Sequence, residues 1–128
     1  MAVRNSAQIS KKLVGLMSRP IIVTGGRDFS DHIMLADVLD FLNPDMIIQG
    51  GAPGADDLAR NYGVENNIAV VTVQADWNTH GKAAGPIRNR AMLDRFKEAV
   101  VVAFPGGKGT ADCVRAAISK NMIVLEVK

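Results

Sequence analysis

Residues 99–110 read AVVVAFPGGKGT, an apolar run that ends in a proline and two glycines before Lys-Gly-Thr. A short, continuous, β-branched run of this kind is typical of a strand buried on both faces of a parallel sheet. We therefore predict a strand over residues 100–104 that opens directly into a glycine-rich turn. Thr110 is a good N-cap residue, so we expect a helix to begin just after it and to bury Val114, Ala117 and Ile118.

Strands of the same character are predicted at residues 21–24, 46–49, 69–73 and 122–127. Two segments between them have the i, i+3, i+4, i+7 apolar spacing of a helix with one buried face: Leu35, Val38, Leu39 and Leu42 in the first, and Ala55, Leu58, Ala59 and Tyr62 in the second. A further helix is expected from Pro86, whose fixed backbone angle suits the first helical position, to about Phe96. This alternation predicts an α/β fold: a single Rossmann-like three-layer domain whose five-stranded, mainly parallel sheet has helices on both faces.

Length and composition indicate one folded domain. The chain has 128 residues, of which 48% are hydrophobic and 22% charged, as in ordinary globular proteins. Its single cysteine, Cys113, cannot form an intramolecular disulfide, and no cluster of Cys and His has the spacing of zinc ligands. The longest apolar run inside the domain, residues 99–104, is far too short to span a membrane, and the N-terminal segment lacks the features of a secretory signal. We therefore expect a cytoplasmic protein with no metal, no cofactor and no membrane contact.

Charge is unevenly distributed along the chain. The first 20 residues hold four basic residues and no acidic one, whereas the remaining 108 hold 11 basic and 13 acidic residues. A surface that binds duplex nucleic acid normally carries a dense cationic face, so this composition argues against nucleic acid as the main partner. We treat residues 1–19 as an N-terminal extension of a domain at 20–128. An apolar stripe in the extension suits a short helix packed on the domain or on another subunit, with a solvated tail as the alternative; the stripe is Ile9, Leu13, Leu16 and Met17.

Ten of the 12 glycines lie in four short segments, each between a predicted strand and the helix that follows it. They are Gly25 and Gly26; Gly50, Gly51 and Gly54; Gly81 and Gly85; and Gly106, Gly107 and Gly109. In a parallel sheet all such connections leave from the same edge, which is where open α/β sheets bind ligands. Glycines let a ligand approach backbone N–H groups, and a helix N-terminus adds unpaired donors and positive partial charge. The pattern therefore predicts an anion site, with a phosphate as its natural occupant.

Two of these loops are the strongest candidates for holding the phosphate. Residues 106–110 combine three glycines with the ammonium group of Lys108 and the hydroxyl group of Thr110. Residues 50–56 form a second loop, in which Asp56 is placed to contact a sugar hydroxyl or a positively polarised group. G-x-G-x-x-G does not follow the first strand, so the standard dinucleotide fingerprint fails. The Walker pattern is also absent, which argues against ATP-driven work.

The connection over residues 75–90 is the longest and most polar of the four. Long loops in compact domains are often functional. This one holds Trp77, which can either stack on a base or close the edge of the core. Arg88 and Arg90 stand at i and i+2 of the following helix and so point in different directions. We expect one of them to face the cleft and the other to meet solvent or a neighbouring subunit.

Five motifs stand in a specific order along the chain. They are Gly-Gly-Arg-Asp-Phe (25–29), Gly-Gly-Ala-Pro-Gly-Ala-Asp (50–56), Ala-Asp-Trp (75–77), His-Gly-Lys-Ala-Ala-Gly-Pro-Ile-Arg-Asn-Arg-Ala-Met (80–92) and Phe-Pro-Gly-Gly-Lys-Gly-Thr-Ala-Asp (104–112). Together they resemble the YspA, cpYpsA-related branch of the SLOG superfamily, a Rossmann-like group that includes the Lonely Guy phosphoribohydrolases and the DNA-processing protein DprA. The resemblance spans residues 20–128 and implies a nucleotide or nucleotide-derived ligand at the glycine loops. Relatives of this branch are common in phages and bacteria.

Lonely Guy enzymes cleave the N-glycosidic bond of a nucleoside monophosphate. Their signature is Pro-Gly-Gly-x-Gly-Thr-x-x-Glu, preceded by an arginine at the start of the previous helix. Residues 105–110 match this signature and Arg88 matches the arginine, but Cys113 stands where the signature has its glutamate. A glutamate there would also complete a capping box with Thr110. On that structural explanation, its absence lowers only the stability of the helix.

The hydrolase reaction needs a carboxylate near the sugar, by analogy with glycosidases. Asp112 is one residue away from the glutamate position, but one step along a helix turns a side chain by about 100°, so it cannot simply substitute. Asp56 and Asp76 are two further candidates for this carboxylate, and the spacing of none of the three is diagnostic. The resemblance makes Arg88, Asp112 and Asp56 the catalytic candidates.

We therefore predict a domain that binds a nucleotide or nucleotide-derived phosphate ligand, as a sensor or a processing module. The residues expected at its site are Gly25, Gly26, Arg27, Gly50, Gly51, Gly54, Asp56, Trp77, Arg88, Pro105, Gly106, Gly107, Lys108, Gly109 and Thr110. Two alternatives stay open: a hydrolase that releases the base from a nucleoside monophosphate in the same pocket, and a single-stranded DNA-binding module. Because superfamily relatives often self-associate, we also expect a homo-oligomer.

Overall fold

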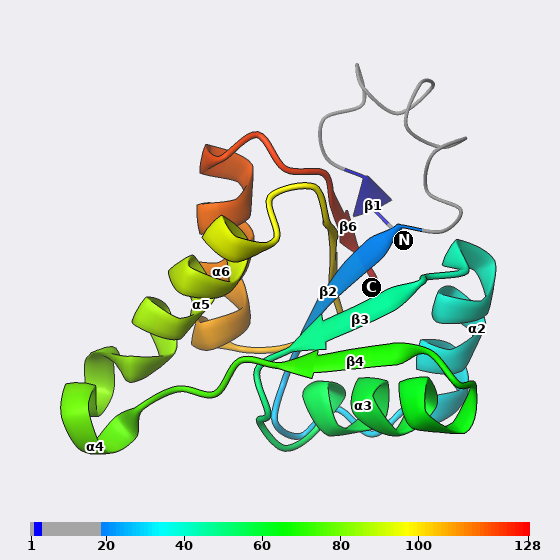
Figure 1. Ribbon diagram of the computed structural model, residues 1–128, viewed down its shortest axis with the longest axis horizontal. Coiled ribbons are helices and arrows are strands. Elements are labelled where there is room, and N and C mark those ends of the chain that lie inside the picture. Colours follow the sequence, from blue (N-terminus) through cyan, green and yellow to red (C-terminus); the bar gives the residue numbers. More distant parts are fainter. Residues whose placement is uncertain (1, 4–18) are drawn as a thin grey trace.

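A six-stranded sheet in the order β1-β6-β5-β2-β3-β4 forms the centre of the computed structural model, which describes residues 2–3 and 19–128 (Figure 1). Its strands are β1 (Ala2–Val3), β2 (Pro20–Thr24), β3 (Met46–Gln49), β4 (Ala69–Thr72), β5 (Val100–Ala103) and β6 (Val124–Glu126). The five strands from β2 to β6 are parallel, and β1 pairs antiparallel with β6 at one edge. The predicted five-stranded parallel sheet is therefore confirmed. The added strand β1 was not predicted, because two residues are too few to show a strand pattern.

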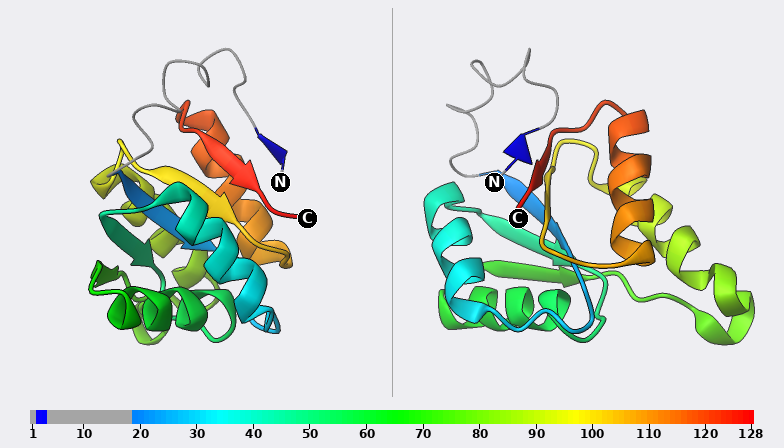
Figure 2. Two further views of the ribbon diagram at one scale, coloured as in Figure 1. Left: turned by 90° about the vertical axis from the view of Figure 1, so that its right-hand side faces the viewer. Right: turned by 180° about the vertical axis from the view of Figure 1, so that it is seen from behind.

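Helices cover both faces of this sheet (Figure 2). In chain order they are α2 (His32–Leu42), α3 (Ala55–Glu65), α4 (Trp77–His80), the 3₁₀-helix η2 (Gly81–Ala83), α5 (Ala84–Arg95) and α6 (Lys108–Ser119). α2 and α3 pack on one face and α5 and α6 on the other, as a three-layer Rossmann-like fold requires. Within the part of the chain that the structure describes, no helix is long and apolar enough to cross a membrane.

The central strands are buried on both faces. Ile21 and Val23 of β2 belong to the core beneath α2 and α3, whereas Ile22 belongs to the core beneath α5 and α6. Alternate residues of β5 divide in the same way, and all four are buried. This two-sided burial explains why these strands are continuous apolar runs in the sequence instead of alternating ones.

The start of α6 differs from the prediction. The helix begins at Lys108 with Gly107 as its N-cap, so Thr110 lies in the first turn and the prediction that it caps the helix is wrong. Glycine at Gly107 accommodates the non-helical N-cap backbone, which allows the helix to begin before the threonine. The capping-box explanation for the missing glutamate is therefore wrong as well, because position 113 is not the third residue of this helix.

The other helical predictions hold with small shifts. α6 buries Val114 and Ala117 as predicted, and Ile118 packs against the same core with partial exposure. α5 begins at Ala84, so Pro86 lies within its first turn. The connection over residues 75–90 is helical for most of its length, because α4 and η2 precede α5. The predicted apolar stripe of the N-terminal extension lies outside the described residues.

β2 is the strand at which the order reverses. The chain moves from β2 to β3 and β4 on one side, then returns to β5 and β6 on the other. The connection after β2 leads to α2 on one face of the sheet and the connection after β5 leads to α6 on the opposite face. Connections that diverge in this way leave a crevice at the carboxyl ends of the two strands.

Candidate ligand-binding site

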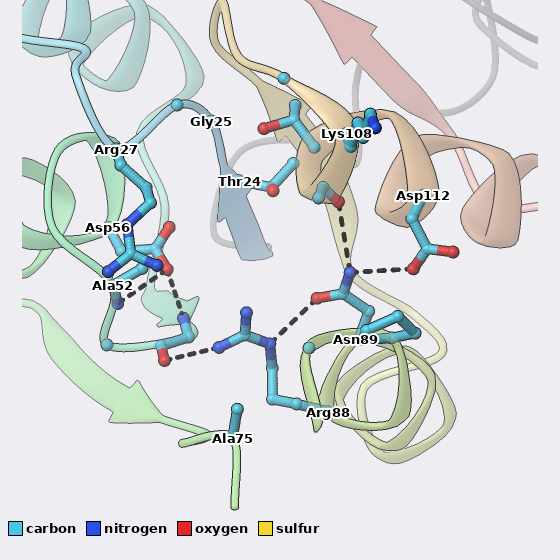
Figure 3. Close-up of a pocket in the computed structure, with 18 of the residues that line it drawn as sticks. Thr24, Gly25, Arg27, Ala52, Asp56, Ala75, Arg88, Asn89, Lys108 and Asp112 are labelled. Carbon is cyan, nitrogen blue, oxygen red and sulfur yellow. Dashed lines mark hydrogen bonds between the residues drawn. The ribbon is translucent and has the colours of Figure 1, made fainter. Parts of the chain in front are cut away.

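A cavity of about 610 Å³ lies at this crevice, and all four strand-to-helix connections contribute to its walls (Figure 3). Most of the residues predicted at the site line it: Gly25, Gly26, Arg27, Gly50, Gly51, Asp56, Trp77, Arg88, Gly107, Lys108, Gly109, Thr110 and the catalytic candidate Asp112. Pro105 and Gly106 line a smaller neighbouring cavity of about 430 Å³ that also contains Gly26. Gly54 lines neither. The topology thus brings the predicted loops together.

The first turn of α6 opens into the cavity. The first hydrogen bond inside this helix runs from the Ala111 N–H to the Gly107 carbonyl, at 3.0 Å. The N–H groups of Lys108, Gly109 and Thr110 therefore have no acceptor within the helix, and no side chain in the described residues caps it. A Cβ placed on Gly107 or Gly109 would meet nothing within 4 Å. These donors and the positive end of the helix dipole form an environment suited to an anion.

The loop between β3 and α3 is arranged differently, because it already holds an anion of its own. The carboxylate of Asp56 is buried and accepts the N–H groups of Gly50 at 3.1 Å and Ala52 at 3.2 Å. The Gly51 N–H donates to the Gln49 side chain at 2.6 Å. Burial raises the pKa of Asp56, while these hydrogen bonds and the nearby Arg88 oppose the rise. This loop therefore presents a carboxylate to the cavity, and the N–H groups of Gly50, Gly51 and Ala52 are already bonded within the protein.

Several predicted glycines serve close backbone packing between the loops. A Cβ on Gly54, whose φ is +84°, would lie 2.1 Å from the Gly26 carbonyl oxygen. A Cβ on Gly106 would lie 2.7 Å from the Gly26 nitrogen and 2.2 Å from the Thr110 hydroxyl. The Gly26 N–H itself donates to the Pro105 carbonyl at 2.8 Å. These residues set the shape of the site, and the Gly26 amide is not free for a ligand.

Arg88 reaches from α5 across the cavity to the β3–α3 loop (Figure 3). Its Nη1 donates to the Gly50 carbonyl at 2.6 Å and to the Val73 carbonyl at 3.5 Å, and its Nε donates to Asn89 at 3.0 Å. Gly50 permits this approach, because a Cβ there would lie 2.1 Å from Nη1. As predicted, only one of the two arginines lines the cavity. Arg90 instead pairs with Asp112 of α6 at 3.0 Å.

The remaining polar candidates are placed as follows. Asp112 lines the cavity, and its hydrogen bond from Arg90 lowers its pKa. Asp76 does not line the cavity; it caps α4 by accepting the Thr79 N–H at 3.1 Å. Hydrogen bonding from the Thr79 side chain, and then from its N–H, lowers the pKa of Asp76. Cys113 is fully buried in the core and burial raises its pKa to about 11, so it is a poor nucleophile. Among the described residues, no three His, Cys, Asp or Glu side chains are grouped to hold a metal ion.

Sequence reasoning missed four polar residues of this site, Thr24, Gln74, Lys82 and Asn89. Lys82 lines the cavity from η2, with an exposed side chain. Asn89 is buried and bonds to Arg88, Asp112 and the Gly109 carbonyl. The sequence feature that could have identified Asn89 is a polar residue at a helix position that faces a neighbouring helix. Asn89 stands between two arginines, which made it look like part of an exposed polar stretch.

The strand order, the divergent connections and the cavity at the reversal define a Rossmann-like α/β protein of the kind that binds ligands at its switch point. Within that class, the chain belongs to the YspA, cpYpsA-related SLOG family, whose model matches residues 19–80. The chain is also similar to the Gene 61 protein of Mycobacterium phage D29, with 37% identity over 119 residues, which cover 84% of this chain and 94% of that protein. The resemblance seen in the sequence is therefore confirmed. Family membership points to the binding or processing of a nucleotide-related ligand.

Proposed function

We propose that this protein binds a nucleotide or nucleotide-derived ligand through a phosphate group, as a sensor or a processing module. The observation that carries the proposal is the uncapped first turn of α6, which opens into the 610 Å³ cavity of a SLOG family member. A phosphate there accepts hydrogen bonds from the N–H groups of Lys108, Gly109 and Thr110. The side chains of Lys108 and Arg88 balance its charge.

The rest of the cavity has room for the nucleoside part of such a ligand. Its volume falls within the roughly 300–1,000 Å³ of small-molecule sites and far exceeds that of a phosphate alone. Asp56 offers a carboxylate to ribose hydroxyls from the β3–α3 loop. Trp77 also lines the cavity and is 54% exposed, so its ring is available for stacking on a base.

Thermal unfolding of the full chain with nucleosides and their 5′-monophosphates tests this proposal. A ligand at a hundredfold its Kd adds about 2.7 kcal/mol to the free energy of unfolding. We expect the monophosphate of at least one base to raise the Tm, and the matching nucleoside to raise it much less. Equal shifts from a nucleoside and its monophosphate would contradict a phosphate site. So would the absence of a shift with the nucleoside monophosphates, nucleoside diphosphates and dinucleotides of all common bases.

Cleavage of the N-glycosidic bond is the second candidate function, and the position of Asp112 at the cavity favours it. Its lowered pKa keeps this carboxylate ionised, as stabilisation of an oxocarbenium-like state requires. Both of its oxygens, however, accept hydrogen bonds from Arg90. The test is incubation with a panel of nucleoside monophosphates followed by chromatography for free base. Intact nucleotides across the panel exclude the hydrolase.

Single-stranded DNA binding and self-association stay predictions. A mobility shift that vanishes at moderate salt and requires Arg4, Lys11 and Lys12 would assign DNA binding to the N-terminal extension and not to the cavity. Light scattering on the full chain decides the oligomeric state.

A further inference from the structure

We propose that Asn89 is a positioning residue, which holds Arg88 and the first turn of α6 in a set arrangement before a phosphate binds. The inference rests on the proposed function, because it concerns the two groups assigned to the phosphate. Asn89 is uncharged and its amide is already bonded to protein groups, so it acts on the phosphate through Arg88 and α6. Its contribution is to keep the arginine and the helix amides directed at the same place.

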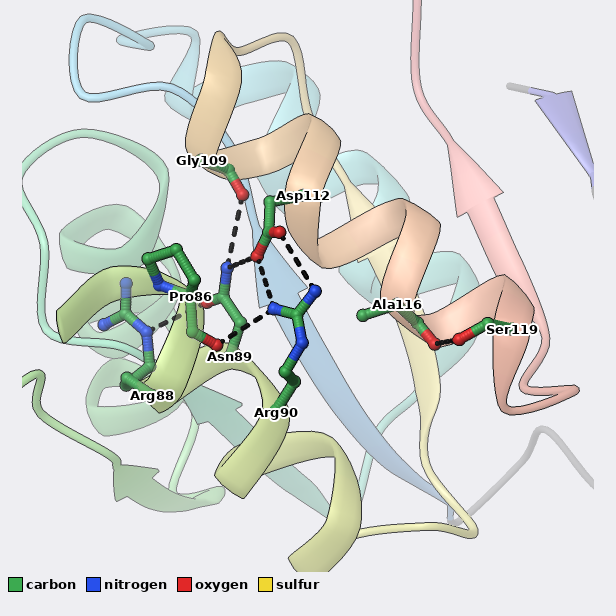
Figure 4. Close-up of polar contacts among 8 residues, drawn as sticks. All are labelled: Pro86, Arg88, Asn89, Arg90, Gly109, Asp112, Ala116 and Ser119. Atoms are coloured by element: carbon green, nitrogen blue, oxygen red, sulfur yellow. Dashed lines mark hydrogen bonds and ion pairs between the residues drawn. The ribbon is translucent and has the colours of Figure 1, made fainter. Parts of the chain in front are cut away.

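The side chain of Asn89 lies between α5 and α6 and is only 4% exposed (Figure 4). Its Oδ1 accepts the Arg88 Nε–H at 3.0 Å. Its Nδ2 donates to the Gly109 carbonyl at 3.3 Å and to Asp112 Oδ2 at 3.1 Å. Arginine can only donate, whereas a carbonyl and a carboxylate can only accept, so these partners determine the orientation of the amide. A primary amide is the neutral side chain that supplies an acceptor and two donors at once.

Arg88 is held at a second point by the β3–α3 loop. Its Nη1 donates to the Gly50 carbonyl at 2.6 Å, and Gly50 has no Cβ to block the guanidinium. Two anchored nitrogens hold the guanidinium plane, and Nη2 has no hydrogen bond within the described residues. The Nη2 donors therefore remain for a phosphate, and the side chain has little freedom left to lose when one binds.

One partner of Asn89, Asp112, also forms an ion pair that does not involve Asn89. Asp112 accepts from Arg90 as well as from Asn89, with Arg90 Nη1 at 3.0 Å and Nη2 at 3.2 Å from its two oxygens. Polar contacts thus run from Arg90 through Asp112 and Asn89 to Arg88 (Figure 4). The bond from Arg88 Nη1 extends them to the Gly50 carbonyl. The network connects α6, α5 and the β3–α3 loop, all of which line the cavity.

The test compares full-length wild type, Asn89→Leu and Arg90→Gln in a titration with inorganic phosphate, followed in ¹⁵N–¹H spectra. Leucine matches asparagine in size but has no polar atom. Arg90→Gln is the matched control, since it removes the outer ion pair and leaves Asn89 and the cavity wall in place. We expect Asn89→Leu to weaken phosphate binding by about tenfold, the size of one lost hydrogen bond to a charged group. Arg90→Gln should change it by less than about twofold.

The same spectra report on positioning directly. An arginine Nε–H gives a resolved signal when a hydrogen bond protects it from exchange, and the Arg88 signal is assigned by its loss in Arg88→Lys. It should be present in wild type and in Arg90→Gln, and lost or strongly shifted in Asn89→Leu. A merely structural residue would leave this signal unchanged.

The outcomes separate the two proposals. If wild type does not bind phosphate, the proposed function fails, while the Nε–H signal still decides whether Asn89 holds Arg88. If wild type binds and Asn89→Leu either binds equally well or keeps the Nε–H signal, the positioning role is overturned. Should Asn89→Leu not fold, Gly50→Ala displaces the guanidinium from its other anchor. Unchanged phosphate affinity in that variant would overturn the role of a held Arg88.

Discussion

The N–H group of Gly26 donates to the carbonyl of Pro105 across 2.8 Å, which joins the loops after β2 and β5 at the strand where the sheet order reverses. The Gly26 carbonyl in turn accepts the Ala55 N–H at 3.1 Å, so the loop after β3 is tied to the same residue. Three glycine-rich loops are thus connected through main-chain atoms alone. These main-chain bonds hold the three loops together in addition to the side-chain bonds of Asp56, Arg88 and Asn89.

Two glycines of one loop should respond in opposite ways to alanine. Gly109→Ala places a methyl group in open space at the cavity and should keep the Tm or raise it, because alanine is favoured over glycine in helices by up to about 1 kcal/mol. It should nevertheless reduce stabilisation by nucleoside monophosphates. Gly106→Ala should lower the free energy of unfolding by about 1–3 kcal/mol, because its methyl group would overlap the Gly26 nitrogen and the Thr110 hydroxyl. Thermal unfolding with and without nucleotide measures both; full nucleotide binding by Gly109→Ala would contradict a phosphate on this turn.

Arg88→Ala should leave the fold intact and remove ligand stabilisation. The side chain is partly buried and its bonds are to two loop carbonyls and Asn89, so its loss should cost only a modest part of the unfolding free energy. Removing a charged donor from a phosphate should weaken binding by about 1.5–3 kcal/mol. Arg88→Lys should restore little, because an ammonium group cannot bond to Asn89 and Gly50 together. Calorimetric titration with the nucleotide that stabilises wild type measures the loss, and an unchanged affinity would show that Arg88 is not a ligand residue.

Cys113 should be chemically inert in the folded protein. Its thiol is fully buried and its pKa of about 11 keeps it protonated at pH 8, so iodoacetamide should modify it slowly in native protein and rapidly in denaturant. Cys113→Ala should bind nucleotide like wild type and lose about 1 kcal/mol of stability through the smaller core volume. Mass spectrometry of the alkylation time course provides the measurement. Fast native modification that nucleotide suppresses would place the thiol in the site instead.

The Asp112–Arg90 ion pair should make stability sensitive to acid. The pKa of Asp112 is lowered in the folded state, so its contribution is present above the unfolded pKa of about 3.8 and is lost as the pH falls through the folded value. Asp56 has a raised pKa and acts with the opposite sign, so the informative comparison is wild type against Asp112→Asn, which share Asp56. Urea unfolding at several pH values should show a stability difference that is constant above about pH 5 and shrinks below about pH 4. A difference independent of pH would mean that the ion pair does not stabilise the fold.

Much of the architecture could be predicted because it is written in local patterns. Runs such as residues 100–104 are continuous and β-branched because a central parallel strand is buried on both sides, and the helix faces follow from a spacing of three and four residues. The start of α6 could not be predicted in this way. Thr110 is a better N-cap residue than Gly107 by local preference, yet the tight packing of Gly106 against Gly26 and Thr110 places the threonine inside the first turn.

The composition of the loops likewise pointed to an anion site at one edge of the sheet, because parallel topology gathers every strand-to-helix turn there. No local sequence pattern could show which backbone N–H groups at that edge remain free of hydrogen bonds. Asp56 occupies two donors of its own loop and Pro105 takes the amide of Gly26, whereas the start of α6 keeps its donors open. The reason is physical: spacing along a chain reports which face a residue occupies, whereas a hydrogen bond such as that from Arg88 to Gly50 joins atoms 38 residues apart and exists only once the layers have packed.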